Sequence, residues 1–336
     1  MITAEKEKQQ KTDEDYILEV NNLKKYFPIK GGILRRTVGH VKAVDDVSLN
    51  IVRGETLGIV GESGSGKTTL GRVILKLLEP TEGQIVFENE DITNSKNRKM
   101  RDIRKDLQVV FQDPYASLNP TMSVQELIEE PLLVQTDLSR KERLQKVEEM
   151  LDKVGLRKSD QLKYPHEFSG GQRQRISIAR ALVLNPKFIV CDEPVSALDV
   201  SIQAQVLNLM ADLQEEFNLT YLFISHDLSV VKHISDRVAV MYLGRIAEVA
   251  PKKAIYEEPL HPYTQALLSA IPTVGKEKKR EKIILEGDLP SPSNPPSGCP
   301  FRTRCPQAHD LCSQVRPDLQ DVGDGRLVAC HLYNEK

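Results

Sequence analysis

The chain has 336 residues, of which 40% are hydrophobic and 28% are charged. Its net charge of −2 excludes an overall positive field that would attract nucleic acid or anionic lipid. This length predicts about two domains, one large and one small. No apolar run approaches the ~18–20 residues that span a bilayer. The N-terminus, MITAEKEKQQKTDEDY, lacks the apolar core of a secretion signal. We therefore expect a disordered segment at 1–16 and a cytoplasmic location.

Residues 17–92 have the pattern of strands. Val47, Leu49 and Ile51 alternate with polar residues, which indicates a half-buried strand. The apolar run ETLGIV (55–60) precedes a glycine-rich loop. A helix follows, with apolar residues on one face at helical spacing: Leu70, Val73, Ile74 and Leu77. A buried strand, a glycine-rich loop and a helix in this order predict a phosphate-binding site.

The glycine-rich loop, GESGSGKT at 61–68, fits the spacing G-x-x-x-x-G-K-[ST]. Glycines let backbone N–H groups turn toward an anion at the start of a helix. Lys67 is expected to reach the β- and γ-phosphates of ATP, and the Thr68 hydroxyl to bind Mg²⁺. The predicted nucleotide-binding residues of this loop are Gly61, Glu62, Ser63, Gly64, Ser65, Gly66, Lys67, Thr68 and Thr69.

The middle of the chain changes character. Residues 113–170 are predicted to form a helical insertion, because Val147, Leu151 and Val154 form an apolar stripe among charges. The run FSGGQRQRISIARAL (168–182) follows as a helix. Its serine and two glycines at the start are a second anion-binding arrangement.

Two further buried strands carry polar residues at their ends. FIVCDE (188–193) ends in two carboxylates: Asp192 is expected to hold Mg²⁺, and Glu193 to polarise an attacking water. TYLFISHD (220–227) follows a helix, and 237–250 predicts a hairpin with Gly244 in its turn. The fold predicted is α/β: a P-loop NTPase core with an antiparallel β subdomain and a helical insertion, plus a small irregular C-terminal lobe.

In combination these motifs resemble the ATP-binding subunits of ABC transporters. FSGGQ is similar to their LSGGQ signature, with Phe168 in place of the leading leucine. The resemblance covers residues 17–250 and implies an ATPase in which two ATP are sandwiched between two chains. It implies that the γ-phosphate bound by one chain is contacted by the signature of the other, here Ser169, Gly170, Gly171 and Gln172.

The resemblance also assigns roles around the phosphates. Gln112 in FQDPY is the loop glutamine that senses Mg²⁺ and water and contacts the transmembrane partner. It joins Thr68 and Asp192 as a predicted Mg²⁺ residue. His226 in ISHD is the switch histidine on the γ-phosphate, so Glu193, His226 and Gln112 are the predicted catalytic residues.

Two more residues have roles by resemblance. Asp199 in SALD lies in the loop that communicates across the dimer. Tyr26 in LKKYFPI stacks on adenine, and Phe27 is the competing choice.

After residue 250 the sequence resembles one branch of the family. HPYTQALLSAIP (261–272) and GDLPSPSNPPSGCPFRTRC (287–305) are similar to the C-terminal extension of oligopeptide and dipeptide importer ATPases, so 251–336 is expected to be this extension. The resemblance implies peptide import, powered from the cytoplasmic face of the cell membrane by a peripheral subunit. Nickel or glutathione as cargo, or a non-transport ABC ATPase, are the alternatives.

The same branch implies partners. They are a second ABC ATPase subunit, two transmembrane permease subunits and, indirectly, an extracytoplasmic peptide-binding protein, with no nucleic acid. The ATPase pair is expected to be a heterodimer, and a homodimer is the alternative.

The tail contains four cysteines, Cys299, Cys305, Cys312 and Cys330. A reducing cytoplasm disfavours disulfides. Structural zinc sites prefer cysteine pairs two to four residues apart, which this spacing lacks, whereas iron–sulfur ligation by four thiolates has looser spacing. Because some members with this tail carry a [4Fe–4S] cluster, the resemblance implies such a cluster, with zinc as the alternative. Cys191, in the strand before Asp192, is predicted to be core.

Overall fold

The computed structural model describes residues 16–32, 36–271 and 281–333. The predicted disordered segment 1–16 thus lies outside the described residues except for Tyr16. The chain divides into two compact units, each assembled from separate segments. The first comprises the residues up to Leu18, Ile51–Thr56 and Phe87–Ile224, and the second comprises Glu19–Asn50, Leu57–Val86 and Ser225–Lys336. The domain bounds expected from the sequence stay a prediction.

A parallel sheet forms the centre of the first unit. Its strands are β6 (Leu107–Val110), β7 (Phe188–Asp192) and β8 (Thr220–Ile224). All residues of β7 and β8 are buried, which explains their apolar sequences, since parallel strands are usually covered on both faces. Parallel strands end at the same edge of a sheet, so the residues that follow β6 and β7 are brought together.

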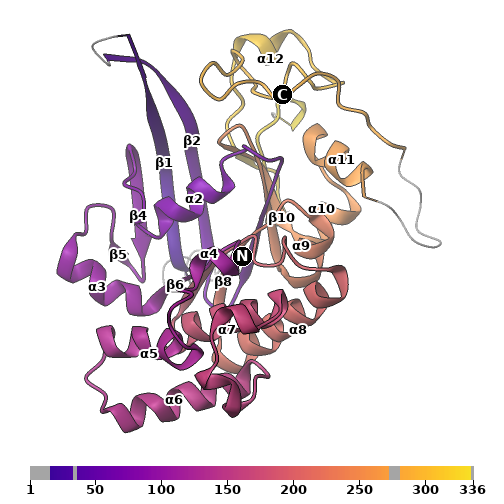
Figure 1. Ribbon diagram of the computed structural model, residues 1–336. Coiled ribbons are helices and arrows are strands. Elements are labelled where there is room, and N and C mark those ends of the chain that lie inside the picture. The colour runs from indigo at the N-terminus through magenta and orange to yellow at the C-terminus, as the bar shows by residue number, and fades with distance from the viewer. Residues whose placement is uncertain (1–15, 33–35, 272–280, 334–336) are drawn as a thin grey trace, which may run out of the picture. The chain divides into compact units, whose positions relative to one another are not determined.

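Helices make up most of the rest of the first unit. Ser123 and Ser139 each start a helix with a capping box, which satisfies two backbone N–H groups. α5 and α6 lie side by side (Figure 1). The elements are α3 (Asn97–Asp106), α4 (Pro114–Ser117), α5 (Val124–Gln135), α6 (Arg140–Lys153), α7 (Gly170–Leu182), α8 (Val200–Phe217), the 3-10 turns η1 (Lys158–Leu162) and η2 (Pro165–Glu167), and the strand β5 (Glu90–Asp91).

The second unit contains two groups of strands. The long strands β2 (Arg36–Val52) and β1 (Tyr16–Gly31) stand side by side, with β4 (Glu82–Phe87) next to β1 (Figure 1). In the other group, β3 (Thr56–Val60) pairs in parallel with β9 (Arg237–Tyr242).

The predicted hairpin is present as β9 and β10 (Arg245–Pro251), joined through Leu243 and Gly244, both with positive φ. β10 then pairs antiparallel with β12 (Leu327–Val328), and β12 with β11 (Gln320–Asp321). The C-terminal residues therefore extend this sheet by ladder hydrogen bonds.

Short helices complete the second unit. They are α2 (Lys67–Ile74), α9 (Leu228–Ile234), α10 (Lys252–Glu257), α11 (Pro262–Ser269), α12 (Asp310–Gln314) and the 3-10 turn η3 (His331–Tyr333). Lys76 has a φ of 54°, which ends α2 early. Leu77, predicted on the buried face, lies beyond the helix and is 47% exposed, so that prediction is wrong. Throughout the described ranges, no helix is both long and apolar enough to cross a membrane.

An aromatic cluster holds the C-terminal segment in the second unit; this name is used for residues 252–271 and 281–333, which follow β10. The ring of Tyr242 meets Tyr263 at 4.7 Å and Phe301 at 5.3 Å between centroids, both edge-on. Phe301 is 2% exposed, and burying a phenylalanine contributes about 1.5–3 kcal/mol. His261 packs beside Phe301 at 5.7 Å. Apolar packing and strand pairing therefore hold a segment rich in proline.

Candidate functional site

The predicted phosphate loop connects β3 to α2 in the second unit. Gly66 has a φ of 103°, and a Cβ there would lie 2.1 Å from the carbonyl oxygen of Ala43, so glycine is required. Ser63 and Gly64 are exposed at the mouth of the loop. The N–H of Gly244 donates to the carbonyl of Ser65 at 2.8 Å. The turn of the β9–β10 hairpin is thus bonded to the backbone of the phosphate loop.

Lys67 lies across this loop. Its side chain is buried, and Nζ donates to the carbonyl oxygens of Gly61 at 2.8 Å and Glu62 at 3.0 Å. Thr68 and Thr69 follow, partly exposed, in the first turn of α2. A lysine and a helix start gathered around a glycine loop form a cradle for phosphate.

The first unit brings two predicted catalytic residues together. Gln112 follows β6 and Glu193 follows β7, and Nε2 of Gln112 donates to Oε2 of Glu193 at 3.1 Å. The backbone of Glu193 is left-handed, with a φ of 48°, and its N–H donates to the carbonyl of Ile224 at the end of β8. Parallel pairing and this strained residue therefore position the carboxylate at the sheet edge.

The predicted Mg²⁺ residues are divided between the units. Asp192 ends β7 and is 5% exposed, and it belongs to the same unit as Gln112. Thr68 and His226 belong to the second unit. Hydroxyl, amide and carboxylate oxygens are the donors that Mg²⁺ prefers, so the residue types fit this ion. That Thr68 and Asp192 bind the same Mg²⁺ stays a prediction. That His226 and Glu193 act at the same γ-phosphate also stays a prediction.

The signature serine is the N-cap of α7. The N–H of Gln172 donates to Oγ of Ser169 at 3.4 Å, and the N–H of Ser169 donates to Oε1 of Gln172 at 3.0 Å. Ser169, Gly170 and Gln172 are exposed. Gly171 is buried, and a Cβ there would lie 2.4 Å from Cγ2 of Ile202 in α8. Gly171 is thus required for the packing of α7 against α8, whereas Gly170 leaves the backbone at the start of α7 exposed.

Asp199 is exposed and precedes α8. Its side chain makes no capping hydrogen bond, and its backbone carbonyl accepts the N–H groups of Ile202 and Gln203 at 2.9 and 2.8 Å. The carboxylate of Asp199 is therefore not used to cap α8 and faces outward. Its predicted role between two chains is compatible with this position and stays a prediction.

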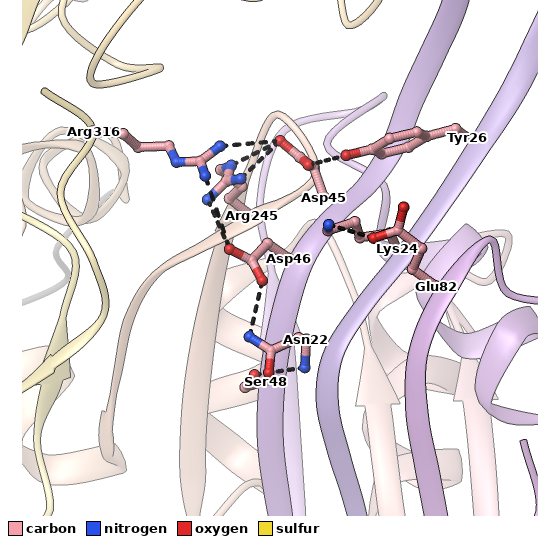
Figure 2. Close-up of polar contacts among 9 residues, drawn as sticks. All are labelled: Asn22, Lys24, Tyr26, Asp45, Asp46, Ser48, Glu82, Arg245 and Arg316. Carbon is pink, nitrogen blue, oxygen red and sulfur yellow. Dashed lines mark hydrogen bonds and ion pairs between the residues drawn. The ribbon is translucent and has the colours of Figure 1, made fainter. Parts of the chain in front are cut away.

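Tyr26 is held by its hydroxyl, which donates to Asp45 (Figure 2). Nε of Arg245 donates to the same carboxylate at 2.9 Å, and Arg316 from the C-terminal segment lies 3.7 Å away. Burial acts to raise the pKa of Asp45, but the Tyr26 hydrogen bond and the Arg245 charge outweigh it, so the pKa is lowered. The Tyr26 ring is fixed in orientation, as a stacking platform requires. Phe27, 36% exposed, stays the alternative.

The predicted metal site of the tail is wrong. Within 16–32, 36–271 and 281–333, no group of three or more His, Cys, Asp or Glu side chains could hold a metal ion. The cysteines are free, and burial raises the pKa of Cys299 and of Cys330 to about 11. Burial in the second unit accounts for both of these shifts, and the rejection of the metal site rests on the absence of a metal-holding group among the described side chains. The four residues of the rejected [4Fe–4S] or zinc site are Cys299, Cys305, Cys312 and Cys330.

Comparison with known proteins places the chain in a family. The family described as ABC transporter matches residues 44–196, and the oligopeptide/dipeptide transporter C-terminal region matches 247–312. Over 325 residues the chain is 59% identical to the oligopeptide transport ATP-binding protein AppF of Bacillus subtilis (strain 168), covering 96% of this chain and 99% of that protein. The chain belongs to the peptide-transport ATPases of the ABC transporter family.

Other members of the family agree with this placement. The ATPase is 51% identical over 327 residues to the dipeptide transport ATP-binding protein DppF of Escherichia coli (strain K12), covering 97% of each chain. A solved dimeric post-hydrolysis state of the ATP-binding cassette MJ0796, bound to ADP and Pi, matches with a TM-score of 0.63 at 30% identity, covering 70% of this chain and 98% of that chain. The predicted α/β P-loop fold and the ATPase activity are therefore confirmed.

Sequence reasoning missed residues that contact the phosphate loop of this ATPase. Tyr263, Leu289 and Arg304 all reach it from the C-terminal segment. They lie inside the two stretches that resemble the importer extension, but no local signal in the sequence connects them with a loop some 200 residues earlier.

Proposed function

We propose that this ATPase powers the import of peptides through separate transmembrane subunits. The observation that carries the proposal is the match of 247–312 to the oligopeptide/dipeptide transporter C-terminal region, next to the ABC match at 44–196. The names of its relatives refer to oligopeptide and dipeptide transport. Nickel, glutathione or a task outside transport are the alternatives that an experiment must separate.

In this proposal the triphosphate of ATP binds the loop Gly61–Gly66 and the start of α2. Lys67, now bonded to two loop carbonyls, would turn its amino group to the β- and γ-phosphates. Mg²⁺ would be held by Thr68, Asp192 and Gln112. The ion supplies charge neutralisation for the phosphate oxygens, while the protein residues orient it.

Glu193 accepts a hydrogen bond from Gln112 at 3.1 Å, which supports their joint role in placing the attacking water. Glu193 would orient and polarise that water, and His226 would contact the γ-phosphate. A positioned base contributes typically about 10²–10⁴ in rate. The chemistry is positioning and charge stabilisation, as in other phosphoryl transfers.

The second half of each ATP site would come from another ATPase chain. Exposure of Ser169, Gly170 and Gln172 at the start of α7 supports this arrangement, as does the dimeric state of the solved cassette. We infer a heterodimer with a related ATPase, with Asp199 near the dimer contact. Closure of the pair would act through the Gln112 region on two permease subunits at the cytoplasmic face of the membrane.

Reconstitution tests this function. The ATPase, a related ATPase subunit and two candidate permeases are placed in liposomes, and ATP hydrolysis is measured with a peptide-loaded binding protein. Peptides are expected to stimulate hydrolysis. Stimulation by Ni²⁺ or glutathione with their binding proteins, and none by any peptide, would reject peptide import in favour of the other cargo.

A further inference from the structure

Glu62 places a negative charge beside the proposed triphosphate site. It is the second residue of the phosphate loop, and its side chain is 26% exposed. The triphosphate of ATP is strongly anionic, so an uncompensated carboxylate on this loop would oppose its binding. Such a residue requires a cation nearby.

Arg304 provides that cation from the C-terminal segment. Its Nη1 donates to both carboxylate oxygens of Glu62, at 2.9 and 3.1 Å, and its side chain is only 9% exposed. The guanidinium carbon lies 6.0 Å from the centre of the Tyr242 ring, within the range of a cation–π contact. A pair buried to this extent is weakly screened by salt.

Tyr263 of the same segment bonds to the loop, and Leu289 lies close to it. The buried Tyr263 hydroxyl accepts the backbone N–H of Glu62 at 3.0 Å. A Cβ at Gly64 would lie 3.8 Å from Cδ2 of Leu289. Since Tyr263 packs on Tyr242, the C-terminal segment contacts both the backbone and the charge of the loop. The segment thus belongs to the outer wall of the proposed ATP site.

We propose that Arg304 is a positioning residue for ATP: it neutralises Glu62 and, together with Tyr263, holds the phosphate loop in its binding shape. The C-terminal segment then contributes to the affinity of this ATPase for nucleotide. This inference rests on the proposed ATP site at Gly61–Thr68.

The test measures binding of a fluorescent ATP analogue with Mg²⁺ to the purified full-length chain. Arg304→Met should weaken binding about tenfold, which corresponds to about 1.4 kcal/mol. Arg304→Lys keeps the charge but loses the planar guanidinium, so its binding should lie between that of the wild type and that of Arg304→Met. Arg302→Met is the matched control, because Arg302 bonds to Ser297 in the same segment, and it should leave binding unchanged.

A second variant separates charge from packing. Glu62→Gln combined with Arg304→Met removes both charges and should restore binding to within about twofold of wild type. Wild-type affinity in Arg304→Met, or a double variant as weak as Arg304→Met, would overturn the proposal. Lys67→Met tests the site itself: if it binds ATP normally, the proposed ATP site fails, whereas its loss of binding beside an unaffected Arg304→Met rejects this inference alone.

Discussion

Acid sensitivity of the C-terminal segment is the first prediction. His261 is buried, and its Nδ1 accepts the N–H of Tyr263 at 3.0 Å at the start of α11. Burial lowers the pKa of His261 from 6.5 to about 4, against the opposing effect of a hydrogen bond with the backbone of Ala329. The folded chain therefore keeps this imidazole neutral, while the unfolded chain takes up a proton as the pH falls below 6.5.

The pKa difference determines the size of the effect. Each pKa unit corresponds to about 1.36 kcal/mol, so His261 lowers the free energy of unfolding by about 2 kcal/mol between about pH 7 and about pH 5. Its stabilisation is fully present above pH 6.5 and is lost toward pH 4. Glu248 accepts the N–H of His261 at 2.9 Å, and burial raises its pKa. Glu248 therefore acts in the opposite sense, with stability lost as the pH rises.

His261→Asn retains an acceptor for the Tyr263 N–H and removes the titration. Thermal unfolding of the full chain is compared at about pH 7 and about pH 5. The melting temperature of the wild type falls between about pH 7 and about pH 5, and this fall should be smaller by about 4–8 °C in the variant. The figure follows because about 2 kcal/mol is lost in the wild type and 1 kcal/mol corresponds to about 2–4 °C in larger domains. His166→Asn replaces an exposed imidazole and should not alter the drop. An equal drop in wild type and His261→Asn would refute the reasoning.

Four other variants test the site. Gly171→Ala should cost about 1–3 kcal/mol in thermal unfolding, because its Cβ would overlap α8, and Gly170→Ala should cost less. Ser169→Ala should cost about 1 kcal/mol through the lost cap and reduce ATP hydrolysis in the assembled transporter; unchanged hydrolysis would count against the signature role. Asp45→Asn should release the Tyr26 hydroxyl and weaken binding of the fluorescent ATP analogue about threefold to tenfold; unchanged binding would argue for Phe27 as the adenine platform.

The parts of the site that could be predicted are local in the sequence. The phosphate loop, the strand ending at Asp192 and the hairpin turn at Gly244 are each specified within about ten residues by glycine placement and apolar runs. Gln112 and Glu193 were both expected to be catalytic. Their hydrogen bond depends on the parallel register of β6 and β7, which no local pattern contains.

The sequence did not predict long-range contacts, the absence of a metal site among the described tail cysteines, or the end of α2. Arg304 and Glu62 are 242 positions apart, so their pairing exists only in the folded chain. The iron–sulfur cluster at Cys299 and its neighbours was expected from resemblance to a branch of the family, and the described residues hold no group that could bind a metal ion. Leu77 matched a helical stripe, whereas the left-handed Lys76 ends the helix before it.

Peptide uptake into liposomes tests the central proposal most directly. The reconstituted transporter, with its peptide-binding protein present outside and ATP inside, is expected to accumulate labelled peptide in the lumen with the ATPase facing it. Glu193→Gln should bind the fluorescent ATP analogue like the wild type and reduce uptake by at least about 10²-fold, the typical contribution of a positioned base. Uptake at the wild-type rate by Glu193→Gln, or uptake without ATP, would contradict an importer powered by hydrolysis at this site.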